Sequence, residues 1–185
     1  QCMLWQTSPA ATEMETRMME WLRQAIGLPG SFSGVIQDSA SSATLAAVLT
    51  MRERSLRWQG NEDGLSQHPK LRIYCSGEAH SSIDRAVWVA GIGSDNIVRI
   101  PVSGAHRSMD PEGLRQAIKN DLAAGYLPIG VIACTGATGM GACDDITAVI
   151  DVAQNFDLYV HVDAAWAGSA MICPEFRSLW EGVEK

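Results

Sequence analysis

The sequence predicts an α/β fold, a three-layer sandwich in which helices cover both faces of a mostly parallel sheet. Short apolar runs typical of buried strands alternate with longer amphipathic stretches along the chain. Of the 185 residues, 46% are hydrophobic and 19% are charged, as in a globular protein that buries one sizeable core. We find no internal repeat and no low-complexity tract, so the fold is expected to form one unit.

A helix is expected near the start of the chain. Ser8-Pro9 pairs an N-cap residue with proline at the first helical position, and Gly27 marks the end of the pattern. The apolar residues between them recur at helical spacing and should face the core or a dimer partner. These residues are Met14, Met18, Trp21, Leu22, Ala25 and Ile26.

The remaining elements follow from apolar runs, which predict strands, and from Ser or Asp before amphipathic stretches, which predicts helix starts. Strands are expected over residues 35–37, 71–75, 96–101, 129–134 and 158–162. Helices are expected over residues 42–56, 83–88, 110–124 and 144–153, and a polar loop over residues 60–70.

Charge and composition exclude several classes of partner. The 14 Lys and Arg residues are scattered, and 21 Asp and Glu residues give a net charge of -7, so neither nucleic acid nor an anionic membrane is expected. No apolar stretch approaches the roughly 20 residues of a membrane span, and no signal segment opens the chain. We therefore expect a cytoplasmic protein. Its cysteines form no Cys-x-x-Cys pair, which argues against a disulfide framework or structural zinc. They are Cys2, Cys75, Cys134, Cys143 and Cys173.

Two loops that follow expected strands are candidate sites. Residues 39–42, Ser-Ala-Ser-Ser, lie where backbone N–H groups, hydroxyls and a helix dipole converge, which suits a phosphate or a plain serine N-cap. The glycine-rich residues 135–141 match neither the dinucleotide nor the Walker pattern. They are expected to form a tight active-site loop or a simple turn.

Asp163 ends an apolar strand, and ligands of open α/β sheets bind at the carboxyl ends of strands. This carboxylate is a candidate functional group or a cap of the following turn. His80 follows another strand and is either functional or a capping or partly exposed histidine. His161 and Asp163 are two residues apart on a strand and should face the same side. Without a third ligand nearby, we expect no metal site.

Four motifs in a fixed order together resemble the group II pyridoxal-phosphate decarboxylases, and most closely the aromatic-L-amino-acid decarboxylase branch. The resemblance covers nearly the whole chain. The motifs are Trp5-x-x-Ser-Pro-Ala-x-Thr-Glu-x-Glu15, Ser39-Ala-Ser41, Ala79-His-Ser-Ser82, and His161-Val-Asp-Ala-Ala-Trp-Ala-Gly-Ser-Ala170 with Ile172-Cys-Pro-Glu-Phe-Arg177. The fold implied is the large domain of fold type I pyridoxal-phosphate enzymes.

The resemblance implies a role for each of four residues. Asp163 would pair with the protonated pyridine nitrogen of pyridoxal 5'-phosphate. His80 would stack on the cofactor ring beside the substrate, so His80 and Asp163 are the expected catalytic residues. Ala40 and Ser41 would bind the phosphate at the helix start.

Two further positions are implied to contact the cofactor. Ala165 would present a small surface under the ring, which a larger side chain would obstruct. Cys134 stands where aromatic decarboxylases usually carry a threonine that contacts the cofactor. The neighbouring Thr135 is the expected substitute for that contact.

The activity implied is conversion of an L-amino acid, expected to be aromatic, to its amine and carbon dioxide by a homodimeric full-length enzyme. A glutamate decarboxylase-like enzyme and an aldehyde-forming relative are alternatives. Family members hold the cofactor covalently on a lysine of an Asn-Pro-His-Lys-type motif. The lysines here, Lys70, Lys119 and Lys185, lie outside such a motif. Residues 1–185 are therefore expected to be part of the large cofactor-binding domain, truncated at both ends and inactive alone. A non-catalytic binding or assembly module is the remaining alternative.

Overall fold

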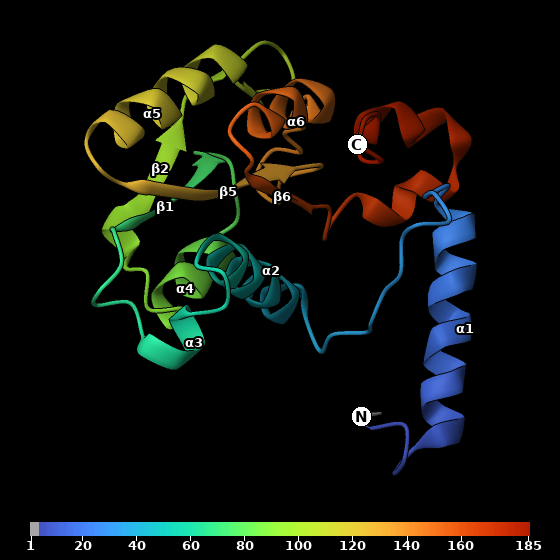
Figure 1. Cartoon of the computed structure of the whole chain (residues 1–185). Coiled ribbons are helices and arrows are strands. Elements are labelled where there is room, and N and C mark those ends of the chain that lie inside the picture. The colour runs from blue at the N-terminus through green and yellow to red at the C-terminus, as the bar shows by residue number, and fades with distance from the viewer. Residues whose placement is uncertain (1–3) are drawn as a thin grey trace.

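A four-stranded parallel sheet lies at the centre of the fold, with strand order β2-β1-β5-β6 (Figure 1). The computed structural model describes residues 4–185. Because neighbouring strands are parallel throughout, their carboxyl ends lie at one edge of the sheet. This confirms the expected fold class. The strands are β1 (Leu71–Ser76), β2 (Ile97–Ile100), β5 (Leu127–Cys134) and β6 (Tyr159–Asp163).

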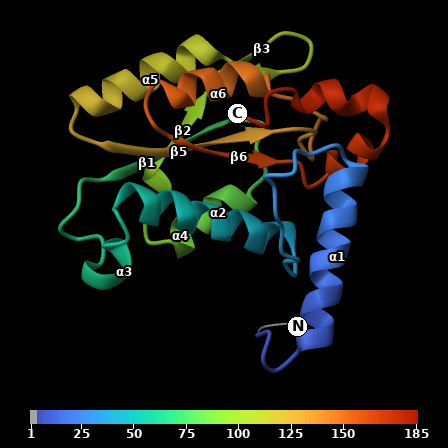
Figure 2. The ribbon, with the colours of Figure 1, turned by 45° about the vertical axis from the view of Figure 1, so that its right-hand side comes forward.

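Helices cover both faces of this sheet, as Figure 2 shows from the side. One face carries α2 (Ala40–Ser55) and α4 (Ser82–Val89), and the other carries α5 (Pro111–Ala123) and α6 (Ile146–Gln154). Helix α1 (Pro9–Ala25) stands away from the sheet. The smaller elements are α3 (Gly60–Asp63), the hairpin of β3 (Val102–Ser103) and β4 (Ser108–Met109), and the 3-10 helices η1 (Ser94–Asn96), η2 (Gly168–Ile172) and η3 (Pro174–Trp180).

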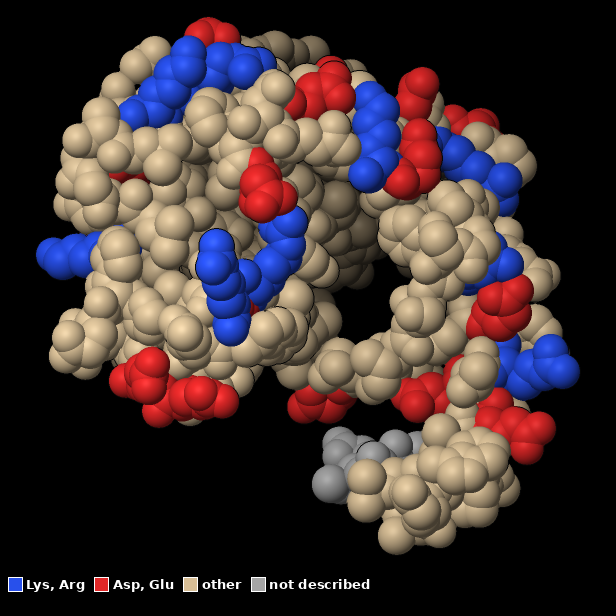
Figure 3. Space-filling view, viewed as in Figure 1, with Lys and Arg blue, Asp and Glu red and all other residues tan. Residues whose placement is uncertain are grey.

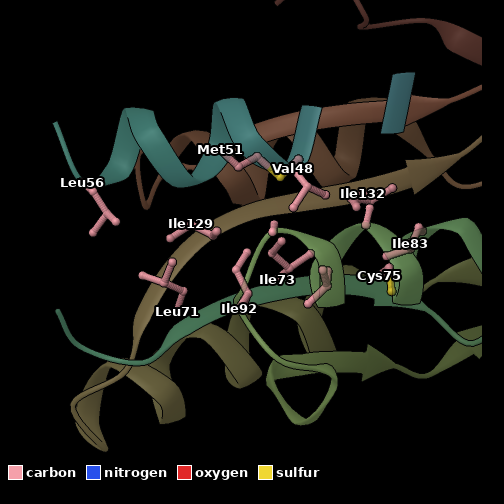
Figure 4. Close-up of a cluster of buried hydrophobic side chains, with 13 residues drawn as sticks. Val48, Met51, Leu56, Leu71, Ile73, Cys75, Ile83, Ile92, Ile129 and Ile132 are labelled. Carbon is pink, nitrogen blue, oxygen red and sulfur yellow. The ribbon is translucent and has the colours of Figure 1, made fainter. Parts of the chain in front are cut away.

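The core below the sheet fixes the position of α2. Val48 and Met51 of α2 pack with Ile73 and Ile129 of the sheet, and all four side chains are fully buried (Figure 4). A Cβ atom on Gly130 would lie 2.8 Å from Cγ of Met51. The glycine therefore lets α2 approach β5 closely, which sets where the first turn of α2 lies relative to the strand ends.

Two expectations from the sequence are wrong. Residues 35–37 do not form a strand, because no neighbouring strand pairs with them. Val35 and Ile36 are exposed, and the Ile36 N–H donates to Glu15 Oε1 at 2.8 Å. Residues 60–70 are not loop throughout, since Gly60–Asp63 form the short helix α3. Sequence periodicity alone does not detect so short a helix.

Helix α1 begins at Pro9 after Ser8, as expected, but the apolar stripe within the helix stays outside the core, and Ile26, which follows the helix, is buried. Met14 and Trp21 are 63% and 59% exposed. The stripe is thus available for contact with another surface.

None of the helices in residues 4–185 combines the length and apolar character needed to cross a membrane. In the view of Figure 3, acidic and basic side chains are interspersed and form no basic stripe.

Candidate functional site

A cavity of about 100 Å³ lies where the carboxyl ends of the strands meet the start of α2. The structure brings together there all six residues singled out from the sequence, although their roles stay predictions. The lining residues are Ala40, Ser41, His80, Ser82, Cys134, Gly136, Ala137, Thr138, Asp163, Ala165 and Trp166. This convergence follows from topology, because helices that return antiparallel to parallel strands begin at the edge where those strands end.

Asp163 provides an unpaired carboxylate to this cavity. Its Oδ1 accepts a hydrogen bond from the Ala165 N–H at 3.1 Å, so it does cap the following turn. Among residues 4–185, no Lys, Arg or His forms an ion pair with it. Capping uses only part of a carboxylate's acceptor capacity. The remaining capacity can hold a cationic N–H group of a ligand.

The start of α2 provides free hydrogen-bond donors. Ser39 caps the helix by accepting from the Ser42 N–H at 3.3 Å, and the Ser42 hydroxyl donates to the Asp38 carboxylate. Within the described residues, the N–H groups of Ala40 and Ser41 donate to no acceptor. Free amides at the positive end of a helix dipole form a phosphate-binding arrangement. Both hypotheses for this segment, serine cap and phosphate site, are therefore compatible.

His80 lines the cavity from the loop between β1 and α4. Its Nδ1 accepts a hydrogen bond from the Ser82 N–H at 3.1 Å, as expected of a capping histidine. Because Nδ1 acts as an acceptor, the ring proton of the neutral imidazole lies on Nε2. The ring is exposed and its orientation is fixed by this cap, which suits it for stacking on a flat ligand.

Cys134 ends β5 with its side chain in the cavity wall, 5% exposed. Burial raises the pKa of its thiol to about 12, and the charges of Asp163 and Asp144 add to the effect. The group is therefore a neutral thiol near pH 7. Thr135 does not line the cavity, so it is not a substitute for the missing threonine contact; its buried hydroxyl finds no partner in the described residues.

Five of the residues that line the cavity were not singled out as site residues from the sequence: Ser82, Gly136, Ala137, Thr138 and Trp166. All five lie in motifs or loops noted in the sequence, but only the fold shows that they line the cavity. Trp166 packs against Gly136, which has a φ of +78° and no space for a side chain, since a Cβ there would lie 2.8 Å from Trp166 Cε3. The glycine-rich segment is thus a tight loop of the site wall.

A larger hollow of about 610 Å³ follows the outer edge of β6. His161 lines this hollow, whereas Asp163 lines the smaller cavity. The two residues were expected to face the same side of the strand, but they do not belong to one site. Burial lowers the pKa of His161, and the charge of Asp163 opposes that shift. No group of three potential ligands within residues 4–185 is arranged to hold a metal ion. The smaller cavity, which contains the Asp163 carboxylate and the free amides of α2, is therefore the better candidate for a ligand site.

Comparison with known proteins assigns the family. Residues 1–185 match the pyridoxal-dependent decarboxylase conserved domain. The chain belongs to this family. It is 42% identical to aromatic-L-amino-acid decarboxylase of Sus scrofa over 97% of its length, and 38% identical to phenylacetaldehyde synthase of Petunia hybrida, also over 97%. The structure of Oryza sativa TDC with PLP and tryptamine matches 97% of the chain at 41% identity and a TM-score of 0.90.

The match covers only part of each relative. This decarboxylase-family chain spans 39% of the Sus scrofa protein, 36% of the Petunia hybrida protein and 38% of the Oryza sativa chain. The similarity to solved structures of fold type I enzymes agrees with the observed three-layer arrangement.

Proposed function

We propose that this chain forms part of the pyridoxal 5'-phosphate-binding domain of an L-amino-acid decarboxylase that acts on aromatic amino acids. One observation supports this most. The Asp163 carboxylate, which has no ion-pair partner among residues 4–185, lines the same cavity as Ala40 and Ser41, whose N–H groups are free. These groups match the two charged parts of the cofactor, a pyridinium nitrogen and a phosphate.

Each residue has a distinct part in this proposal. When bound, pyridoxal phosphate supplies an electron sink for the pair left behind as carbon dioxide departs. Asp163 keeps the proton on the pyridine nitrogen, because its charge favours the protonated ring. Ala40 and Ser41 would hold the phosphate, His80 would stack on the ring and orient the substrate, and Ala165 would leave room for the ring.

Cys134 contacts the ring from the end of β5 in this proposal. A neutral thiol offers a weak donor and an apolar surface, unlike the hydroxyl of the usual threonine. We expect cofactor affinity to tolerate the exchange, since the stronger contacts come from Asp163 and the α2 amides.

An aldehyde-forming enzyme is the second candidate. The 38% identity to phenylacetaldehyde synthase of Petunia hybrida supports it, because both activities occur among similarly close relatives. Measuring carbon dioxide, amine, aldehyde and hydrogen peroxide made by the full-length enzyme distinguishes the two. An amine product favours the decarboxylase, and an aldehyde product favours the alternative.

We further propose that the full-length enzyme is a cytoplasmic homodimer. The exposed apolar stripe of α1 supports a subunit contact, because large apolar patches on soluble proteins commonly mark interfaces. The four described cysteines are free thiols, which is consistent with a reducing compartment.

We also propose that residues 1–185 bind the cofactor without a covalent bond and do not decarboxylate alone. None of the three lysines lines the cavity, and Lys185 pairs with Asp151 at 3.1 Å. A longer chain that includes the family's lysine motif should develop visible absorbance with pyridoxal phosphate. A colourless longer chain would instead favour a non-catalytic binding module.

Titration of the chain with pyridoxal phosphate, followed by quenching of tryptophan fluorescence, tests the cofactor site. Asp163→Asn should weaken binding about tenfold or more, because a charge-assisted hydrogen bond is lost. Asp157→Asn is the matched control, since Asp157 is exposed and pairs with Arg54 outside the cavity. Equal affinities of the wild-type chain and Asp163→Asn would contradict the assignment.

A further inference from the structure

Asp144 is a buried carboxylate behind the wall of the cofactor cavity. It is 6% exposed and lies between the glycine-rich loop and α6. Its Oδ2 accepts a hydrogen bond from the Cys134 N–H and its Oδ1 accepts one from the Met109 N–H, both at 2.7 Å. One side chain thus connects the end of β5 to the β3–β4 hairpin.

The backbone of Asp144 strengthens the same connection. Its N–H donates to the carbonyl of Cys134 at 2.8 Å, so Asp144 engages both polar backbone groups of that residue. On the other side, the Thr135 N–H donates to the Asp163 carbonyl at 2.9 Å. The end of β5 is therefore held between Asp144 and the strand that carries Asp163.

The charge of Asp144 has no cationic partner among residues 4–185. Burial raises the pKa of its carboxyl group, and the two N–H donors oppose that shift. A buried charge held only by amides destabilises a fold unless those bonds are well made. A carboxylate at this position is therefore better explained by its role in holding the Cys134 and Met109 backbones in place than by a net gain in the stability of the fold.

Asp144 does not itself line the cofactor cavity. It faces a separate hollow of about 470 Å³ beneath the β3–β4 hairpin. Its direct contact with the cavity wall is through Cys134, whose backbone it binds and whose thiol lies in that wall.

We propose that Asp144 is a positioning residue of the cofactor site, which holds Cys134 in register with Asp163 at the cavity wall. This inference rests on the proposed function only where its test measures the affinity for pyridoxal phosphate. Removal of the carboxylate charge should loosen the end of β5 and make the Cys134 thiol easier to ionise.

Asp144→Asn tests this proposal with little change in shape. An amide side chain has one acceptor oxygen, so either the Cys134 or the Met109 N–H loses its partner. Asp145→Asn is the matched control, because the neighbouring Asp145 is exposed and accepts from the Ala148 N–H at 3.0 Å as the cap of α6. Thermal unfolding of both variants reports the effect on stability.

Two readouts separate positioning from a purely structural role. Alkylation of Cys134 by iodoacetamide in the native protein, followed by mass spectrometry at pH 8.5, should be at least tenfold faster in Asp144→Asn. The affinity for pyridoxal phosphate should fall at least fivefold. Asp145→Asn should change neither. Lower thermal stability of Asp144→Asn with unchanged Cys134 alkylation and cofactor affinity would overturn the proposal.

The cofactor-free readout keeps the two proposals distinguishable. If the wild-type chain binds no pyridoxal phosphate, the proposed function fails, and Cys134 alkylation still decides whether Asp144 controls the strand end. If Asp144→Asn does not fold, NMR of the wild-type chain replaces it. The amide signals of Cys134 and Met109 should then shift with one common midpoint above the ordinary aspartate pKa of 3.8. Independent or absent titration of these amides overturns the proposal.

Discussion

Cys134 and Asp163 are register partners at the carboxyl ends of β5 and β6. This pairing places a thiol and a carboxylate in the wall of the same cavity. The charge of Asp163 adds to burial in raising the pKa of the thiol, so the thiol is neutral near pH 7. The site therefore presents a negative charge to a ligand at the sheet edge, and free amides at the nearby helix start.

The first prediction concerns the N–H groups at the start of α2 that are proposed to bind the phosphate. Ala40→Pro should leave the fold intact, because Ala40 is the first residue of α2 and the preceding Ser39 is extended, with φ -160° and ψ 163°. The substitution removes one N–H donor, so affinity for pyridoxal phosphate should fall about tenfold or more. Fluorescence titration measures the affinity, and thermal unfolding checks stability. Unchanged affinity would argue against phosphate binding at this amide.

The second prediction concerns the loop beneath Trp166. Gly136→Ala should lower the free energy of unfolding by about 1–3 kcal/mol, because the residue has a positive φ and the new methyl group meets Trp166 and Ala167. Gly139→Ala is the control, since a Cβ atom at Gly139 has no neighbour within 4 Å. Urea unfolding of both variants tests the difference. Equal stabilities would mean that the loop is not tightly packed.

The third prediction concerns the pH dependence of stability. Because burial lowers the pKa of His161 below its ordinary value of 6.5, the unfolded chain takes up a proton first as the pH falls. The contribution of His161 is fully present above pH 6.5 and is lost as the pH falls toward the folded pKa, by at most about 1.4 kcal/mol per pH unit. Asp163 opposes the shift, and Arg54 and Lys185 line the same hollow.

Urea unfolding at pH 7.5, 6.5 and 5.5 tests this effect. His161→Gln should reduce the loss of stability between pH 6.5 and 5.5, whereas His106→Gln should not, because His106 is exposed. The same pH dependence in the wild-type chain and both variants would show that His161 is not the group responsible.

The fourth prediction concerns α1. Trp21→Glu should weaken self-association, because Trp21 lies in the exposed apolar stripe of this helix. Trp88→Glu is the control, since Trp88 is similarly exposed but lies on α4. Sedimentation velocity over a range of concentrations measures association. A dimer that survives Trp21→Glu, or a chain that is monomeric throughout, would exclude this stripe as the contact.

The order of strands and helices was predictable because each sheet strand is a short apolar run bounded by turn residues. Val35 and Ile36 have the same local character, but a strand also requires a partner, and the fold places none beside them. The apolar periodicity of α1 correctly predicted a helix. It could not show that the stripe faces away from the sheet, because periodicity does not identify the contacting surface.

The position of the candidate site was predictable where a polar residue ends a strand or begins a helix, as at Asp163 and Ser41. Asp144 was missed as a separate feature because Asp144-Asp145 together indicated a helix start. The structure divides these roles, since Asp145 caps α6 and Asp144 binds the Cys134 N–H. Contacts between residues ten positions apart, as here, depend on the path of the loop.

A crystal structure of the chain soaked with pyridoxal phosphate tests the central claim most directly. The proposal predicts the phosphate within hydrogen-bonding distance of the Ala40 and Ser41 amides, the pyridine nitrogen beside the Asp163 carboxylate, and the His80 ring over the cofactor. Cofactor density in the hollow along β6, or a ring nitrogen turned away from Asp163, would contradict it.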